Sequence, residues 1–195
     1  MVFENGSRSA SGGPLKNQPT DSLWAQSLSN QDLASARRQT RARQASAGPQ
    51  RAWTPAPIPT PWLQGSQLIG IFEGRADWDE PASFPLPAHL PTAVPCVDGT
   101  NMHFERVSDR QRVEPDTLLV PALFADGEGR RVGRGRGYYD RYLAAHPQVR
   151  TVAVVHSDYV FQRLPDAWLH AGDQPVQGLL TESYFYDFQT RRPKP

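Results

Sequence analysis

Two apolar runs on either side of a short helical pattern limit what this chain can fold into. Residues 116–121 and 151–155 are continuously apolar over most of their length, which is typical of strands covered on both faces. Between them, residues 138–146 place apolar side chains at the i, i+3, i+4, i+7 spacing of a helix. A strand–helix–strand order predicts an α/β fold with a mostly parallel sheet and helices on both faces.

The rest of the chain divides into a tail and one domain. Residues 1–28 are polar and rich in Ser and Gly, so we expect a disordered N-terminal tail. The 195-residue length then leaves a single α/β domain over residues 29–190. Its first element is a helix capped by Ser29 or Asn30 that ends near Gly48.

Proline dominates the next segment. The alternating prolines of residues 55–61 favour extended backbone and oppose a helix. The other expected elements are strands at 67–72, 94–97 (with Pro95 at its edge), 102–107 and 178–181, a hairpin turn at Asp98-Gly99, and a weak helix over 161–169.

Composition excludes several classes of protein. A net charge of +1 does not by itself indicate a polyanionic partner. No apolar run approaches the roughly 18 residues that a membrane span needs. The single Cys96 excludes an internal disulfide and a Cys-based zinc site, and the five histidines show no metal-ligand spacing. These features favour the cytoplasm, without a membrane or nucleic-acid partner.

The segment of residues 131–137, hereafter the Gly/Arg loop, packs three glycines and three arginines into seven residues. Alternate glycines let backbone N–H groups approach a ligand, and the guanidinium groups between them match phosphate oxygens. The following helix adds the positive end of its dipole, and Asp140 places a carboxylate where a phosphate-bound Mg²⁺ needs one. The pattern predicts a nucleoside triphosphate site.

Other readings of these residues stay open. A short Arg/Gly cluster can also bind RNA. Asp140 can be the ion-pair partner of a neighbouring arginine, and Asp173 a turn residue. The tyrosines of the motif can be packing residues, and the arginines of residues 37–43 a solvated helix face.

The apolar strand of residues 116–121, the Gly/Arg loop and Tyr138-Tyr139-Asp140 together resemble the signature of the 5-formyltetrahydrofolate cyclo-ligases, also called methenyltetrahydrofolate synthetases. Similarity continues through Gln162-Arg163-Leu164-Pro165, Asp173, Val176 and Thr181-Glu182, and Arg37-Arg38-x-x-Arg41 is similar to the family's N-terminal basic helix. The chain departs from the family in a shortened stretch before residue 116 and a Pro-rich segment at 72–95.

This resemblance implies ATP- and Mg²⁺-dependent cyclisation of 5-formyltetrahydrofolate to 5,10-methenyltetrahydrofolate, with release of ADP and phosphate. ATP would turn the formyl oxygen into a leaving group that N10 of the folate displaces. Such phosphoryl transfer depends mainly on positioning and charge neutralisation. The alternative is a non-catalytic nucleotide- or phosphate-binding relative that acts through a protein or RNA partner.

Site residues follow from the same resemblance. Arg136 and Tyr139 would be catalytic, Asp140 and Asp173 would hold the metal, and Glu80 (or Asp79) and Tyr138 would contact the substrate. The remaining ATP-binding set comprises Arg37, Arg38, Arg41, Arg131, Gly133, Arg134, Gly135, Arg136, Gly137, Tyr138 and Tyr139.

Overall fold

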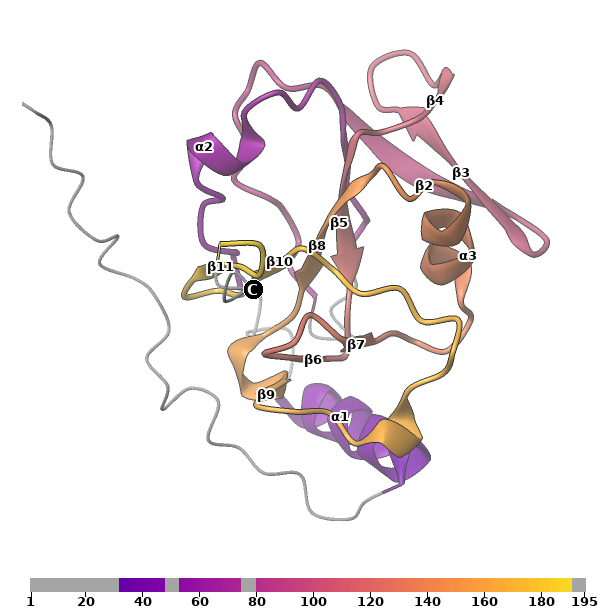
Figure 1. The fold of residues 1–195 in the computed structure, drawn as a ribbon, viewed down its shortest axis with the longest axis vertical. Helices are drawn as coiled ribbons and strands as arrows, with labels where there is room; N and C mark the ends of the chain where they lie inside the picture. The colour runs from indigo at the N-terminus through magenta and orange to yellow at the C-terminus, as the bar shows by residue number, and fades with distance from the viewer. Residues whose placement is uncertain (1–31, 48–52, 75–79, 191–195) are drawn as a thin grey trace, which may run out of the picture.

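The two apolar runs form neighbouring parallel strands at the centre of the molecule (Figure 1). They are β5 (Thr117–Pro121) and β8 (Arg150–Val154), with Leu118 opposite Thr151. This computed structural model describes residues 32–47, 53–74 and 80–190, with a mostly parallel sheet and few helices. The expected α/β class is confirmed.

Within the described residues, the main sheet has eight strands in the order β11-β10-β8-β5-β1-β2-β3-β4. The five central strands are parallel, because β1, β2 and β10 join β5 and β8 in one direction. Antiparallel strands β11, β3 and β4 close the two edges. The further bounds are β1 Ile69–Gly70, β2 Thr92–Asp98, β3 Asn101–Arg106, β4 Arg112–Val113, β10 Gly178–Leu180 and β11 Phe185–Asp187.

Both faces of this sheet are covered. Leu118 and Val120 of β5 pack with Tyr142 and Leu143 of α3 (Tyr138–Ala145). Leu119, which points to the other face, packs with the Pro-rich segment and with α2 (Thr60–Leu63). The alternation along β5 therefore buries one strand between two apolar clusters, as its continuous apolar sequence predicted.

A smaller, mixed sheet lies beside α1 (Leu33–Ala47) (Figure 1). It has the order β7-β6-β9 and consists of β6 Phe124–Asp126, β7 Arg131–Val132 and β9 Val160–Phe161. Ala36 of α1 belongs to the same apolar cluster as Phe124 and Phe161, so this packing holds the basic helix next to the Gly/Arg loop.

Three sequence-based expectations need correction. The Pro-rich run contains one helical turn, α2, because Pro61 lies in its first turn, where no N–H bond is lost. The expected helix at 161–169 is instead β9 followed by a one-turn 3₁₀ helix at Asp166–Trp168, with another at Ser157–Tyr159 before it.

Pro95 lies in an interior strand rather than at an edge. It is tolerated there because β1 ends at Gly70, opposite Ala93. The N-terminal cap of α1 is Asp32, whose Oδ1 accepts the Ser35 N–H at 2.8 Å.

Some predictions lie outside the described residues. They include the tail at 1–28, the caps Ser29 and Asn30, and Asp79. In the part of the chain that the structure covers, none of the helices has the length and apolar character to cross a bilayer.

Candidate active site

A cavity of about 850 Å³ opens at the carboxyl ends of three parallel strands. Its lining includes Phe72 just after β1, Val94 to Val97 in the second half of β2, and Pro121 at the end of β5. The strand order reverses here, since β1 pairs with β2 on one side and β5 on the other. Ligands of open α/β sheets bind at such switch points.

The Gly/Arg loop forms one wall of this cavity. Gly135 and Gly137 have φ values of 94° and 64°, which residues with a Cβ rarely adopt. Gly137 also precedes the first residue of α3, so the loop runs directly into that helix. The backbone geometry therefore needs glycine at both positions.

Arg131 and Asp140 form an ion pair beneath this wall. Arg131 Nη2 lies 2.7 Å from Asp140 Oδ1, and the side chains are 3% and 21% exposed. The same carboxylate oxygen accepts the Gln174 N–H at 3.2 Å. Burial lowers the pKa of Arg131, and the charge of Asp140 opposes that effect.

Arg37 of α1 reaches across to the loop. Its Nη2 donates to the Gly133 carbonyl oxygen at 3.0 Å, although the two residues are 96 apart in sequence. Burial lowers the Arg37 pKa, while the charge of Asp173 raises it. Both Arg37 Nε and Arg131 Nε are buried without a hydrogen-bond partner in the described parts of the chain.

These two N–H groups fit an anionic ligand, because a buried donor left without an acceptor is costly. Asp140 and Asp173 border the same cavity and offer oxygen ligands, which Mg²⁺ prefers. Asp173 Oδ2 also accepts the His170 N–H at 2.8 Å, which orients its carboxylate. The residues present therefore fit a triphosphate with a divalent cation.

Other residues predicted for the site differ in position. Arg134 and Arg136 line the cavity, while Arg38 is exposed and donates to Ser35 Oγ at 2.7 Å within its own helix. The Arg41 side chain lies outside the described residues. Glu80, predicted to bind the substrate, is 3% exposed, is not among the residues that line the cavity, and forms an ion pair with Arg134.

The two tyrosines of the motif occupy different environments. Tyr138 donates to the Gly99 carbonyl oxygen at 3.1 Å, and the Arg141 guanidinium lies 5.2 Å from its ring centre. Tyr139 packs against the apolar cluster under α3 and also lines the cavity. Burial, then the charge of Glu80, raises the Tyr139 pKa well above its usual value, so its hydroxyl stays protonated.

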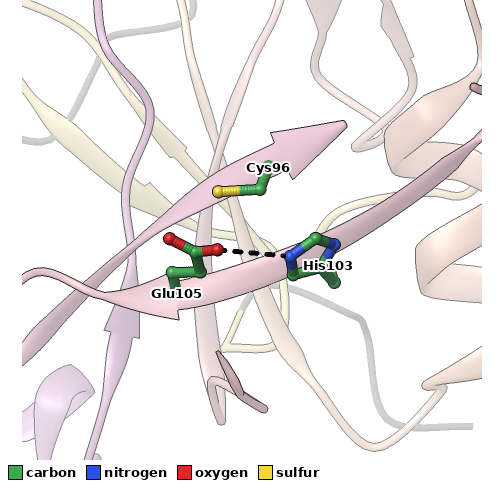
Figure 2. A group of neighbouring side chains, drawn as sticks. All are labelled: Cys96, His103 and Glu105. Carbon is green, nitrogen blue, oxygen red and sulfur yellow. Dashed lines mark ion pairs between the residues drawn. The ribbon is translucent and has the colours of Figure 1, made fainter. Parts of the chain in front are cut away.

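The hairpin of β2 and β3 forms the opposite wall, and Cys96 and Met102 are among the residues that line the cavity. Sequence reasoning did not connect Cys96 with His103 and Glu105, which lie beside it on the hairpin (Figure 2). Burial raises the pKa of the Cys96 thiol, and Glu105 adds to the effect. Strand register, which spacing along the chain does not reveal, brings the three together.

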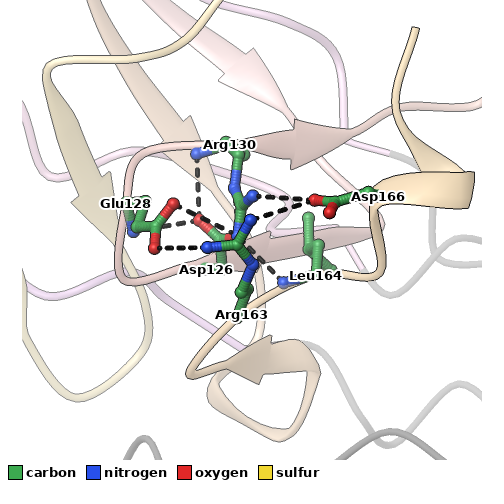
Figure 3. Close-up of polar contacts among 6 residues, drawn as sticks. All are labelled: Asp126, Glu128, Arg130, Arg163, Leu164 and Asp166. Carbon is green, nitrogen blue, oxygen red and sulfur yellow. Dashed lines mark hydrogen bonds and ion pairs between the residues drawn. The ribbon is translucent and has the colours of Figure 1, made fainter.

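A buried carboxylate fixes the turn that leads into the Gly/Arg loop (Figure 3). Asp126 is fully buried and accepts the backbone N–H groups of Glu128, Arg130 and Leu164 at 2.9, 3.1 and 2.9 Å. The Arg130 side chain completes the site, since its Nε donates to Asp126 Oδ2 at 2.8 Å. Because its oxygens are satisfied by protein groups, we assign Asp126 to the architecture of the loop.

Known proteins resemble this chain in sequence and in fold. Residues 89–182 match the model of the 5-formyltetrahydrofolate cyclo-ligase family. Over 55 residues the chain is 49% identical to the 5-formyltetrahydrofolate cyclo-ligase of Mycolicibacterium smegmatis, covering 27% of each protein. A match of 55 residues to the Mus musculus 5-formyltetrahydrofolate cyclo-ligase is 36% identical and covers 26% of this chain and 27% of that protein.

The aligned segments thus span only 27% of the length of these curated relatives. The fold agrees over a longer range. The 5,10-methenyltetrahydrofolate synthetase of Aquifex aeolicus superimposes with a TM-score of 0.52 at 23% identity, covering 85% of this chain and 89% of that one. Residues 89–182, which include the Gly/Arg loop, Asp140 and Asp173, match the 5-formyltetrahydrofolate cyclo-ligase family and confirm the resemblance predicted from the sequence.

Proposed function

We propose that this chain is an ATP- and Mg²⁺-dependent ligase that cyclises 5-formyltetrahydrofolate to 5,10-methenyltetrahydrofolate and releases ADP and phosphate. The observation that carries the proposal is the convergence of the Gly/Arg loop, Arg37, Asp140 and Asp173 on one cavity. The family match over residues 89–182 supports the choice of reaction. We also propose that the protein acts in the cytoplasm, as its single cysteine led us to expect.

In this proposal the loop binds and orients the phosphates. Backbone N–H groups of the loop and the N-terminus of α3 contact the anion, and Arg37 and Arg134 neutralise part of its charge. Arg136 is exposed at the cavity and free to follow the transferred group. Asp140 and Asp173 would hold the Mg²⁺, and ATP would supply the phosphoryl group that turns the formyl oxygen into a leaving group.

The folate would occupy the side of the cavity nearest the hairpin. That side includes Phe72, Met102 and Tyr139, which offer apolar and aromatic surface for a flat ring system. Tyr139 keeps its proton and can donate a hydrogen bond to the substrate at neutral pH. Glu80 would act indirectly, by holding Arg134 in place.

The test is the appearance of methenyltetrahydrofolate absorbance after the chain is mixed with ATP, Mg²⁺ and 5-formyltetrahydrofolate. We expect turnover by the wild-type chain and a loss of about 100-fold or more in Asp140→Asn, measured at a temperature where circular dichroism shows that the variant is still folded, because the change also weakens the ion pair with Arg131. ATP binding without any product would contradict the proposal and favour a non-catalytic relative. Full activity in Asp140→Asn would remove that carboxylate from the reaction.

A further inference from the structure

Three side chains of different ligand chemistry meet on one face of the β2–β3 hairpin (Figure 2). Cys96 lies directly opposite His103 in the antiparallel register. Glu105 follows His103 by two residues, so its side chain projects from the same face. The sulfur, imidazole nitrogen and carboxylate oxygen all lie within 4.8 Å of one another.

The ion pairs within this cluster are long, so its side chains can move together around an ion. His103 Nε2 lies 3.6 Å from Glu105 Oε1, and Arg110 Nε lies 3.7 Å from Glu105 Oε2. Both separations exceed ordinary hydrogen-bond lengths, and the Arg110 side chain is 69% exposed and can turn into solvent. The His103 and Glu105 side chains are each 26% exposed, so an ion among them would be partly shielded from water.

The ligand types select among metals. A thiolate, an imidazole and a carboxylate form a mixed S, N and O set, which suits Zn²⁺. Mg²⁺ prefers oxygen ligands and octahedral geometry, so this cluster is chemically distinct from the Asp140 and Asp173 pair. Three protein ligands also leave one position of a tetrahedral ion open.

We propose that Cys96, His103 and Glu105 form a Zn²⁺ site at the edge of the cavity, with its fourth position available to water or an anionic ligand. Cys96 and Arg110 both line the cavity, which places the cluster on its rim. The inference does not depend on the proposed cyclo-ligase activity, because it rests on the hairpin alone. The proposal differs from the expectation, drawn from the sequence, that the cysteine and histidines of this chain have no part in metal binding.

The direct test is a titration of the full chain with Co²⁺, which reports tetrahedral thiolate ligation by its absorption spectrum, followed by displacement with Zn²⁺. We expect a thiolate-to-cobalt charge-transfer band that saturates at one equivalent and disappears on addition of Zn²⁺. A cobalt spectrum without that band, or with octahedral character only, would overturn the site.

Substitutions test whether the ion binds at the hairpin. Cys96→Ser and His103→Gln should each weaken Zn²⁺ binding by more than about 100-fold, since loss of a mere hydrogen-bond partner of a ligand costs about 10- to 100-fold. His89→Gln, which changes an exposed histidine away from the cluster, is the matched control and should bind as the wild type does. Zn²⁺ affinity that survives in Cys96→Ser but falls in Asp140→Asn would move the ion to the carboxylate pair and overturn the proposal.

Discussion

The two walls of the cavity are held in place by different kinds of contact. The Gly/Arg loop is fixed by charged groups from distant parts of the chain, among them Arg37 and Glu80. The opposite wall is a regular hairpin in which six residue pairs join β2 to β3. A wall built from buried charges should fail when one partner is removed, whereas a ladder of backbone bonds should tolerate single changes.

The largest effect is expected from Arg131→Met. This change removes the partner of Asp140 and should lower the free energy of unfolding by about 3 kcal/mol, because a partly buried carboxylate loses its counter-charge. Urea denaturation measures this loss. Arg136→Met, on the exposed side of the same loop, should change stability by less than about 0.5 kcal/mol. Equal stabilities for the two variants would show that the Arg131 pair does not hold the wall.

The next largest effect is expected from one of two matched glycine substitutions, one in each wall of the cavity. Gly135 and Gly99 both have positive φ, at 94° and 58°, so alanine costs strain on the order of 1 kcal/mol at either position. At residue 135 the new Cβ would lie 3.2 Å from Arg37 Nη1, while at residue 99 it would meet nothing within 4 Å. We expect Gly135→Ala to lower kcat/KM by about tenfold or more, because a small displacement of a positioning group is costly.

Gly99→Ala is the control, and its kcat/KM should stay within about twofold of the wild type. Steady-state rates of product absorbance measure both variants. A similar loss of activity in the two would mean that the hairpin wall is as sensitive as the loop, which would remove the contrast between them.

A third comparison separates two neighbouring arginines of α1. Arg37→Ala should raise the Kd for ATP by about tenfold, or ~1.4 kcal/mol, because its guanidinium group faces the cavity. Arg38→Ala should change the Kd by less than about twofold, since that side chain is exposed and bonds within its helix. The reverse order of affinities would assign the phosphate contact to Arg38.

The smallest effect is expected where the two walls touch. Tyr138→Phe removes the hydrogen bond to the Gly99 carbonyl and should cost about 0.5–1 kcal/mol of unfolding free energy. Tyr142→Phe is the matched control. Its hydroxyl is buried without a hydrogen-bond partner among the described residues, so its removal should be neutral or stabilising. A larger cost for Tyr142→Phe in denaturation experiments would reverse this assignment.

The same contrast explains how much of the molecule the sequence predicts. The strands β5, β8 and β10 and the helix α3 are local patterns, and all were expected close to their observed bounds. The small sheet of β7, β6 and β9 was not, because strands of two or three residues are set by the packing of Phe124 and Phe161 rather than by periodicity.

The candidate site also contains some features that the sequence predicts and others that only the folded structure shows. The spacing of glycine and arginine in the loop predicted a phosphate-binding wall, since those residues are adjacent in sequence. The pairing of Arg134 with Glu80, and the meeting of Cys96 with His103, depend on tertiary structure and register. A buried carboxylate such as Asp126, which looks like any turn residue in the sequence, is recognised only from its four hydrogen-bond donors in the folded protein.

Equilibrium dialysis of the purified chain against labelled ATP, with and without Mg²⁺, tests most directly whether the Gly/Arg wall binds a nucleotide. The account predicts one saturable site whose affinity increases with Mg²⁺ and falls about tenfold in Arg37→Ala. Absence of ATP binding under both conditions, or binding of equal strength in wild type and Arg37→Ala, would contradict it.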